Sequence, residues 1–387
     1  MSAQDRVQLA LVGCGGIAGA HRKAYQALWE KGLREFEIVA TCDVERARAE
    51  QLAGEIAAFQ GRRPAVYERV EDLLAREPGV EATDICALHR AHHDLACACL
   101  DAGKHVTIEK PLAITLRAGR RILDAAERGQ RLLMVAENYR RSPAERAIRW
   151  AIASGRIGQL RQLYWVDVSE RLWYWGWRDH KDLAGAGWTL DGGVHFADLF
   201  RYHLGEVETV YAVSRAYNPT RYRKPETREN PIQATVEDTT MAVLTFSNGV
   251  VGTWSSTGAA PGRGFQDRVL YGDLGSLSWR DGLQTRGETL AMPELVAQFK
   301  AQLSAADSER LFPSGIEDSM ATELLEFVRA VRGRGTLEIT GLEGYKDQAL
   351  SMAVYESDAL GAPVRIADVE ALKVEAYQGE LNRGLGL

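Results

Sequence analysis

A glycine-rich turn between a predicted strand and a predicted helix is the feature that most constrains the fold of this chain. The apolar run Val7–Val12 leads directly into a turn with glycines at positions 13, 15, 16 and 19, and a helical pattern follows. Glycine permits a tight turn and lets a backbone approach a pyrophosphate, and the N-terminus of the next helix offers free N–H groups. The sequence therefore predicts a dinucleotide-binding unit, with cofactor contacts at Gly13, Gly15, Gly16 and Ile17.

An acidic residue follows the second predicted strand. Residues Phe36–Cys42 are rich in β-formers, and Asp43 comes directly after them. A carboxylate at this position accepts hydrogen bonds from ribose hydroxyls and repels a 2′-phosphate, which favours NAD over NADP. Arg46 lies close enough to soften that preference. The alternative role for Asp43 is to cap a helix that begins at Val44, and both roles are compatible.

Strands and helices continue to alternate through the first third of the chain. Residues 80–88 read as a strand, 92–102 as a helix and 105–108 as a further strand, which predicts a doubly wound parallel sheet. His89, His92 and His93 cluster at the carboxyl end of a strand, where such sheets bind ligands. No carboxylate or thiolate completes an obvious metal site there, so we expect cofactor contacts and no metal.

The tripeptide Glu109-Lys110-Pro111 follows the strand at 105–108. Pro111 restricts Lys110 to an extended backbone, so its side chain points in a defined direction at the carboxyl edge of the sheet. A lysine held there can donate to a substrate hydroxyl or stabilise its alkoxide. The alternative is a surface lysine paired with Glu109.

A second candidate for proton transfer lies in residues 189–198. Asp191, His195 and Asp198 stand at i, i+4 and i+7, on one face if the segment is a single helix. A carboxylate beside an imidazole can fix its tautomer and raise its basicity. The Gly192-Gly193 pair lets another backbone or a ligand come close. The alternative is a core histidine that is merely hydrogen-bonded.

Taken together, these motifs resemble the Gfo/Idh/MocA family of NAD(P)-dependent oxidoreductases, which includes glucose–fructose oxidoreductase and inositol dehydrogenase. The resemblance rests on the glycine turn, His92, residues 103–106 with Glu109-Lys110-Pro111, and the spacing of Asp191, His195 and Asp198. It implies an α/β protein: an N-terminal Rossmann dinucleotide-binding domain, then a C-terminal α/β domain with an open, mainly antiparallel sheet that often mediates oligomerisation.

The resemblance also implies site residues. Lys110, Asp191 and His195 match the family's catalytic triad, with His195 as the general acid/base, and Glu109 and Lys110 join the cofactor contacts. Ala87-Leu88-His89 departs from the turn that family members often carry before the strand-end histidine, and this affects the expected nicotinamide-side contacts of Leu88 and His89. Trp188 is unusually bulky for its position.

The second half of the chain reads as a substrate-binding and oligomerisation domain. We place the boundary between residues 1–140 and 141–387, with C-terminal helices that can pack back on the first domain. Three tryptophans before the second motif suit a wall for stacking sugar rings, although they can equally pin a loop as a hydrophobic cluster. The predicted substrate contacts are Tyr139, Arg140, Trp173, Trp175, Trp177, Asp191 and His195.

Further strands are predicted at 207–217, 239–246, 250–256 and 268–271, with a long polar loop at 218–238 and a helical insertion at 294–311. Amphipathic helices are expected at 318–331 and 344–360, followed by a short strand at 363–366.

Composition narrows the partners and the compartment. The 387 residues carry a net charge of −6 and no basic run, so we expect neither nucleic acid nor an anionic membrane as a partner. The chain begins without the layout of a secretory signal, and no apolar run reaches membrane-spanning length. The five cysteines are expected to be reduced, buried and inert, as in a cytoplasmic protein. We expect a homodimer or homotetramer.

The sequence thus predicts an NAD-dependent dehydrogenase, with NADP the less favoured cofactor, that oxidises a secondary hydroxyl of a sugar, cyclitol or related polyol. His195 would take the hydroxyl proton, Asp191 would orient His195, and Lys110 would stabilise the alkoxide. Lys110 and His195 can exchange these roles. The competing functions are an NAD-dependent glycosidase that uses transient oxidation and a non-catalytic nucleotide- or sugar-sensing regulator of the same fold.

Overall fold

The computed structural model describes residues 5–387, which divide into two compact units. One unit holds the described residues up to Ala113, Arg117–Asn138 and Glu309–Tyr345, and the other holds Ile114–Leu116, Tyr139–Ser308 and Lys346–Leu387. A C-terminal segment therefore belongs to the same unit as the N-terminal residues. The predicted functional division into a cofactor domain and a substrate domain stays a prediction.

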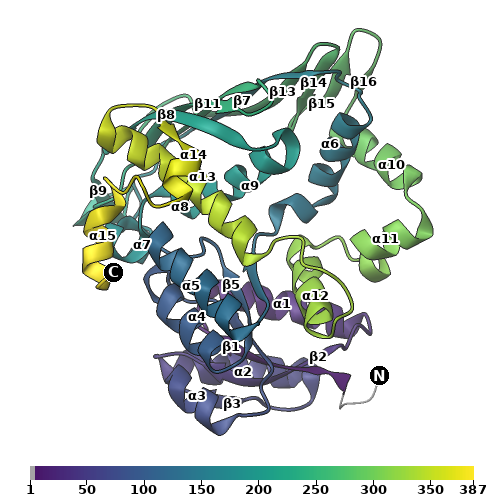
Figure 1. Ribbon diagram of the computed structural model, residues 1–387, viewed down its shortest axis with the longest axis vertical. Helices are drawn as coiled ribbons and strands as arrows, with labels where there is room; N and C mark the ends of the chain where they lie inside the picture. The colour runs from purple at the N-terminus through teal and green to yellow at the C-terminus, as the bar shows by residue number, and fades with distance from the viewer. Residues whose placement is uncertain (1–4) are drawn as a thin grey trace. The chain divides into compact units, whose positions relative to one another are not determined.

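The first unit contains a six-stranded parallel sheet in the order β3-β2-β1-β4-β5-β6 (Figure 1). The chain winds outward from β1 in both directions, which confirms the predicted doubly wound Rossmann sheet. Its strands are β1 (Val7–Val12), β2 (Phe36–Cys42), β3 (Ala65–Tyr67), β4 (Ala82–Ile85), β5 (His105–Glu109) and β6 (Leu133–Ala136).

Helices join these strands and bury the sheet. Leu9 and Leu11 of β1 and Ile38 of β2 are fully buried, as expected for strands covered on both faces. The core also includes Leu324 and Phe327, which come from the C-terminal segment. The helices are α1 (Gly16–Glu30), α2 (Arg46–Gln60), α3 (Val70–Arg76), α4 (His92–Asp101), α5 (Leu116–Gly129) and α12 (Ser319–Val331).

The second unit is built on a nine-stranded sheet in the order β16-β15-β14-β13-β7-β12-β11-β8-β17. Every neighbouring pair is antiparallel except β7 with β12, so the predicted open, mainly antiparallel sheet is confirmed. The strands are β7 (Leu160–Val168), β8 (Val207–Arg215), β11 (Thr239–Phe246), β12 (Val251–Thr257), β13 (Phe265–Gly272), β14 (Gly275–Ser278), β15 (Gly282–Thr285), β16 (Thr289–Leu290) and β17 (Val364–Arg365).

One face of this sheet packs on helices (Figure 1). The buried ring of Trp165 on β7 contacts the rings of Phe196 and Phe200 on helix α9, with centroids 4.7 and 5.1 Å away. Trp254 on β12 contacts Phe200 at 5.3 Å. The remaining helices of the chain are α6 (Pro143–Ala153), α7 (Lys181–Ala184), α8 (Trp188–Asp191), α9 (Gly193–Leu204), α10 (Met292–Gln302), α11 (Ala305–Leu311), α13 (Gly341–Leu360), α14 (Ile366–Glu370) and α15 (Gln378–Leu385).

The opposite face of the sheet presents apolar side chains at alternate positions. Met241 and Val243 of β11 are 58% and 51% exposed, while Ala242 and Leu244 between and beside them are buried. Tyr211 of β8 pairs with Val243 and is also exposed. The strand period of two therefore places a band of apolar side chains on one exposed face.

Two predictions of local structure were wrong. The polar stretch at 218–238 contains a two-stranded hairpin, β9 (Thr220–Lys224) with β10 (Glu229–Gln233). Strand β9 alternates threonine and tyrosine with arginine, a pattern that allows strand pairing although the segment is polar. The segment with Asp191 and His195 is two helices, α8 and α9, divided at Gly192.

The cysteines and charges agree only partly with expectation. All five cysteines are free thiols, as expected. Four of them are buried, but Cys97 on α4 is only half-buried, so the prediction that all five are buried was wrong for this residue.

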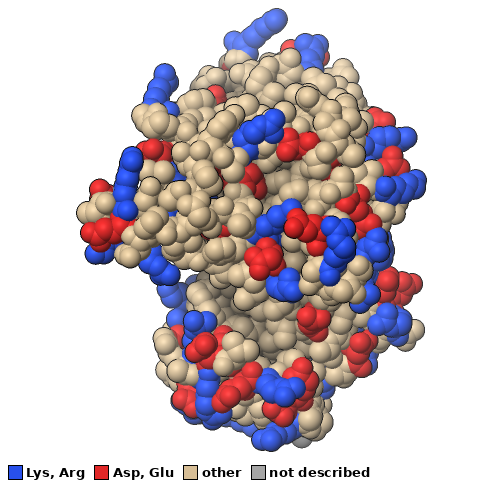
Figure 2. All heavy atoms as spheres, turned by 90° about the vertical axis from the view of Figure 1, so that its left-hand side faces the viewer, with Lys and Arg blue, Asp and Glu red and all other residues tan. Residues whose placement is uncertain are grey.

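On the face drawn in Figure 2, Lys and Arg side chains are interspersed with Asp and Glu. Among residues 5–387, no helix is both long and apolar enough to cross a membrane. Residues 1–4, where the absence of a signal layout was noted, lie outside the described part.

Candidate active site

The glycine turn has the geometry that a dinucleotide requires. Gly13 has φ of +86°, and a Cβ there would lie 2.7 Å from the carbonyl carbon of Cys86, so only glycine fits. A Cβ added at Gly15 or Gly16 would meet nothing within 4 Å, so space is open beside the turn. In the fully described helix α1, no side chain caps the N-terminus and the first turn holds no acidic residue. This N-terminus therefore fits a pyrophosphate.

Asp43 is anchored to the same turn. Its Oδ2 accepts the backbone N–H of Cys14 at 2.7 Å, and its Oδ1 accepts that of Glu45 at 2.8 Å. Helix α2 begins at Arg46, and Glu45 is its N-cap residue. The alternative prediction, in which Asp43 caps a helix that begins at Val44, was therefore wrong. The bond to Glu45 closes a turn ahead of the helix instead. The Arg46 guanidinium pairs with Glu50 at 2.9 Å.

His92 is held by backbone carbonyls. Its ring is fully buried, with Nδ1 2.9 Å from the oxygen of Pro111 and Nε2 3.1 Å from that of Ala87. Burial, with a smaller contribution from His89, lowers the pKa of His92 to about 4. The neutral ring donates to one of the two carbonyls and braces the segments after β4 and β5. The His92 side chain thus supports these segments, and its predicted contact with a cofactor stays a prediction.

The other residues predicted to contact a cofactor after β4 lie close to His92 in sequence. Leu88 is half-buried and directly precedes a short 3₁₀ helix, His89–Ala91. The His89 ring lies 5.6 Å from that of His92, between centroids, and is buried. His93 pairs with Asp94 at 3.1 Å.

Glu109 ends β5 and fixes the backbone of Lys110. Its Oε2 accepts the Lys110 backbone N–H at 3.1 Å, and its Oε1 lies 3.0 Å from Nε2 of His21. Lys110 is half-buried, and its peptide bond to Pro111 is cis. The predicted orientation of Lys110 by its neighbours thus has a structural basis in Glu109 as well as in Pro111.

In the second unit, the helix junction at Gly192 separates Asp191 from His195. Asp191 is the last residue of α8, and its Oδ1 accepts from Nε of Arg178 at 3.0 Å. His195 lies in the first turn of α9, and its ring stacks on that of Tyr139 with centroids 3.9 Å apart. The carboxylate therefore has an arginine partner that the sequence motif did not reveal.

Tryptophan rings pack directly against the two glycines. A Cβ on Gly192 would lie 2.5 Å from the ring of Trp188, and a Cβ on Gly193 would lie 2.7 Å from that of Trp254. Side-chain rings thus approach most closely at these glycines, and the backbone oxygen of Trp188 lies 3.4 Å from the position of a Cβ on Gly193. A larger residue at either position would displace a ring and disturb the junction.

Arg140 is committed to an internal ion pair. Its Nε donates to Oδ2 of Asp198 at 3.0 Å, and its Nη2 contacts Oδ1 of the same carboxylate. Arg140 is 8% exposed and Asp198 is fully buried. This bidentate pair ties the 3₁₀ helix Tyr139–Arg141 to α9 and so brings Tyr139 to His195. The predicted substrate contact of Arg140 stays a prediction.

The tryptophans form one cluster with two arginines. Trp173 and Trp175 meet edge to face at 5.6 Å between centroids, and Trp175 lies 5.7 Å from Trp188. Arg178 lies over the rings of Trp175 and Trp177, at 5.1 and 4.3 Å. Trp173 and Trp188 are 44% and 40% exposed, so both side chains of this tryptophan cluster are partly accessible to solvent. Arg171 lies over Trp173 and Trp175, each at 5.4 Å.

Sequence reasoning missed the residues that position α8. Glu237 is half-buried; its Oε2 accepts the Gly187 N–H at 2.9 Å and its Oε1 accepts from the Tyr355 hydroxyl at 2.6 Å. Burial raises the pKa of Glu237. Arg178 and Glu237 together hold the two ends of a four-residue helix. Only the run of tryptophans around Arg178 offered a signal in the sequence.

Comparison with known proteins gives matches over both units. Residues 7–137 match the model described as "Oxidoreductase family, NAD-binding Rossmann fold", and residues 146–278 match the "GFO/IDH/MocA C-terminal domain". The chain is 28% identical over 402 residues to levoglucosan dehydrogenase of Pseudarthrobacter phenanthrenivorans, which covers 95% of this chain and 100% of that protein. It is 30% identical over 302 residues to 1,5-anhydro-D-fructose reductase of Ensifer adhaerens, with coverage of 77% and 83%.

A solved structure shares the fold. A levoglucosan dehydrogenase in complex with NADH and L-sorbose superimposes with a TM-score of 0.75 and 24% identity, over 94% of this chain and 100% of that chain.

Proposed function

Because the chain belongs to the Gfo/Idh/MocA family of oxidoreductases, we propose that it is an NAD-dependent dehydrogenase of polyols. It oxidises a secondary hydroxyl of a sugar, cyclitol or anhydrosugar to a ketone, and it reduces the ketone in the reverse direction. The relatives named levoglucosan dehydrogenase and 1,5-anhydro-D-fructose reductase support this substrate class.

The first unit holds the cofactor. The pyrophosphate lies at the N-terminus of α1 beside Gly15 and Gly16, where the open space was found. Asp43 accepts from the ribose hydroxyls, because its anchored carboxylate is already aimed by the turn. The same charge disfavours NADP. Leu88, His89 and Glu109 line the nicotinamide side. Bound NAD⁺ supplies the hydride acceptor of the reaction.

Two side chains carry the proton transfer. His195 takes the hydroxyl proton, and its stack on Tyr139 holds the plane of the imidazole. Lys110 stabilises the developing alkoxide with its ammonium group. The two can exchange these roles. Asp191, neutralised on one side by Arg178, offsets the positive charge that His195 gains.

The substrate lies against the tryptophan cluster. Sugars present apolar C–H faces that stack on aromatic rings, while their hydroxyls bond to nearby polar groups. Trp173 and Trp188 are exposed, and Trp175 lies between them, edge to face with Trp173 and tilted against Trp188. The observation that carries the proposal is this aromatic cluster, which Arg178 links to Asp191, because an aromatic wall beside a site for proton transfer suits a polyol.

The protein assembles as a homodimer or homotetramer through the exposed face of the nine-stranded sheet. Met241, Val243 and Tyr211 form part of the apolar band on that face. Apolar patches of this kind on a broad surface are usually covered by a partner. A second copy covers the band by isologous contact.

A substrate screen tests the reaction. Levoglucosan, 1,5-anhydrohexitols, myo-inositol and free aldoses are incubated with stoichiometric excess of NAD⁺, and NADH is followed by its absorbance. We expect net accumulation of NADH with at least one of them. Cleavage of a chromogenic glycoside with only catalytic NAD⁺ and no net NADH would identify a glycosidase instead. NAD binding without turnover of any polyol or glycoside would identify a regulator.

A further inference from the structure

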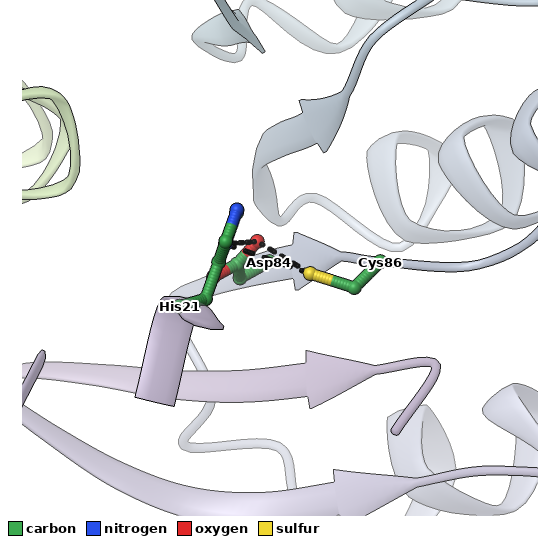
Figure 3. Close-up of side chains that lie close together, drawn as sticks. All are labelled: His21, Asp84 and Cys86. Carbon is green, nitrogen blue, oxygen red and sulfur yellow. Dashed lines mark hydrogen bonds and ion pairs between the residues drawn. The ribbon is translucent and has the colours of Figure 1, made fainter. Parts of the chain in front are cut away.

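A buried cluster of ionisable groups in the first unit connects α1 with β4 and β5. Figure 3 shows three of its side chains, His21, Asp84 and Cys86. His21 projects from α1 toward Asp84 on β4, with Nδ1 2.9 Å from Oδ2 and 3.1 Å from Oδ1. On the other side of the ring, Nε2 lies 3.0 Å from Oε1 of Glu109. His21 and Asp84 are fully buried, and Glu109 is 6% exposed. The imidazole thus bridges two carboxylates from neighbouring strands.

The contacts of His21 favour an imidazolium between two carboxylates. A neutral imidazole carries one N–H, and an ionised carboxylate only accepts hydrogen bonds. With a neutral ring and two carboxylates, one nitrogen lone pair would face a carboxylate oxygen at about 3 Å, which is repulsive. An imidazolium donates from both nitrogens and satisfies both oxygens. Burial lowers the pKa of His21, but Asp84 raises it by charge and hydrogen bonding, and the net pKa lies well above its ordinary value.

Cys86 and Tyr25 complete the surroundings. The Cys86 Sγ lies 3.5 Å from Nδ1 of His21, and burial raises the pKa of this thiol, which stays protonated. The Tyr25 hydroxyl donates to Oδ2 of Asp84 at 3.2 Å. Donors therefore surround Asp84 on both sides. His21, Asp84 and Cys86 offer nitrogen, oxygen and sulfur atoms that a metal ion could also use, but hydrogen bonds already satisfy these atoms.

The bridge reaches Lys110 through Glu109. One oxygen of Glu109 faces His21, and the other accepts the backbone N–H of Lys110. We propose that His21 is a positioning residue: as a doubly donating imidazolium, it ties Glu109 at the end of β5 to α1 and to Asp84 on β4, and so fixes the backbone from which Lys110 acts. This proposal rests on the proposed dehydrogenase reaction for its kinetic consequence, but not for the protonation state of the bridge.

The kinetic test compares two substitutions on the same helix. His21→Gln keeps a donor for one carboxylate but cannot bridge both, so Glu109 and Lys110 lose their anchor. We expect kcat to fall by about tenfold or more while the Kd for NAD changes by less than about threefold. Tyr25→Phe removes one hydrogen bond from the same Asp84 and leaves Glu109 held, so its kcat should stay within about twofold of the wild type. An unchanged kcat in His21→Gln, or an equal fall in both variants, would overturn the proposal.

A spectroscopic test uses the unmodified protein and does not depend on turnover or on a variant that folds. In ¹⁵N-histidine-labelled protein, the ring of His21, assigned by through-bond correlation, is examined at mildly alkaline pH. We expect two nitrogen-bound protons, where an ordinary histidine is neutral and carries one. One unprotonated nitrogen would overturn the proposal, as would a stoichiometric metal ion in the purified protein. If no polyol is oxidised, the dehydrogenase assignment fails while this result still decides the state of His21.

Discussion

The imidazole of His195 lies flat on the phenol ring of Tyr139, with centroids 3.9 Å apart and ring planes 1° apart. The contact joins two segments that are far apart in sequence, and the buried pair of Arg140 with Asp198 secures it. Stacking holds the plane of the imidazole while the ring nitrogens remain at its edge. The plane in which His195 can exchange a proton is therefore set by Tyr139.

The first prediction follows from this stack. Tyr139→Ala should lower kcat by about 2- to 12-fold, since an aromatic contact of this kind contributes about 0.5–1.5 kcal/mol. Tyr139→Phe keeps the ring and serves as the matched control, with kcat close to that of the wild type. Steady-state kinetics at saturating NAD⁺ measures both. A loss in the phenylalanine variant as large as in the alanine variant would assign the effect to the hydroxyl and not to the stack.

Cofactor choice should depend on Asp43. The unmodified protein should show a kcat/KM for NAD that exceeds that for NADP by about tenfold or more, which corresponds to about 1.4 kcal/mol. Asp43→Asn removes the charge but keeps an oxygen to accept the N–H of Cys14 or Glu45, so the preference should narrow with little loss of stability. Equal use of both cofactors by the unmodified protein would contradict the role of Asp43.

Acid stability should depend on His92. In the folded protein burial lowers the pKa of His92 from 6.5 to about 4, so the unfolded state binds an extra proton between these values. The free energy of unfolding should therefore fall as pH drops from 6.5 toward 4, with a full contribution from this site of about 3 kcal/mol. His21 does not cancel this loss. Its pKa is raised in the folded protein, so its contribution to the free energy of unfolding is already complete below pH 6.5 and does not change across this range.

The measurement is denaturant unfolding at several pH values for the wild type and His92→Gln. The variant is expected to be less stable at neutral pH, because the brace to Pro111 or Ala87 is lost, but its stability should vary less across this acid range. Parallel pH profiles for the two proteins would show that His92 does not titrate as argued.

Assembly should depend on the exposed face of the nine-stranded sheet. Met241→Glu places a charge in the apolar band and should shift the oligomer toward monomer in light scattering at micromolar concentration. Leu360→Glu is the control, since Leu360 is 50% exposed and Met241 58%, but Leu360 ends α13 and lies outside the sheet. A wild-type monomer, or an equal effect of the two substitutions, would contradict this interface.

Local patterns were enough to predict the Rossmann half of the fold. Strand β1, the turn at Gly13 and helix α1 follow from an apolar run, a positive φ that favours glycine and a helical period, all within one short segment. The end of β2 placed Asp43, and the end of β5 placed Lys110. Each of these features depends on residues that are neighbours in sequence.

The partners of the site residues depend on tertiary contacts and were not predicted. Arg140 and Asp198 are 58 residues apart, and their ion pair is visible only in the folded chain. The i, i+4 spacing of Asp191 and His195 suggested one helix, but the rings of Trp188 and Trp254 occupy the space beside Gly192 and Gly193 and accompany a break there. Spacing along a sequence does not report such packing.

The central claim is that Lys110 and His195 carry the proton chemistry of a polyol dehydrogenase, and its most direct test is kcat in Lys110→Met and His195→Ala, measured beside the Kd for NAD and the Tm of the same preparations. We predict that kcat falls by about two to four orders of magnitude in each variant, while the Kd and Tm change little. Near-normal turnover in either variant would remove that residue from the mechanism, and a fall in Tm with normal turnover per folded molecule would show that its role is structural.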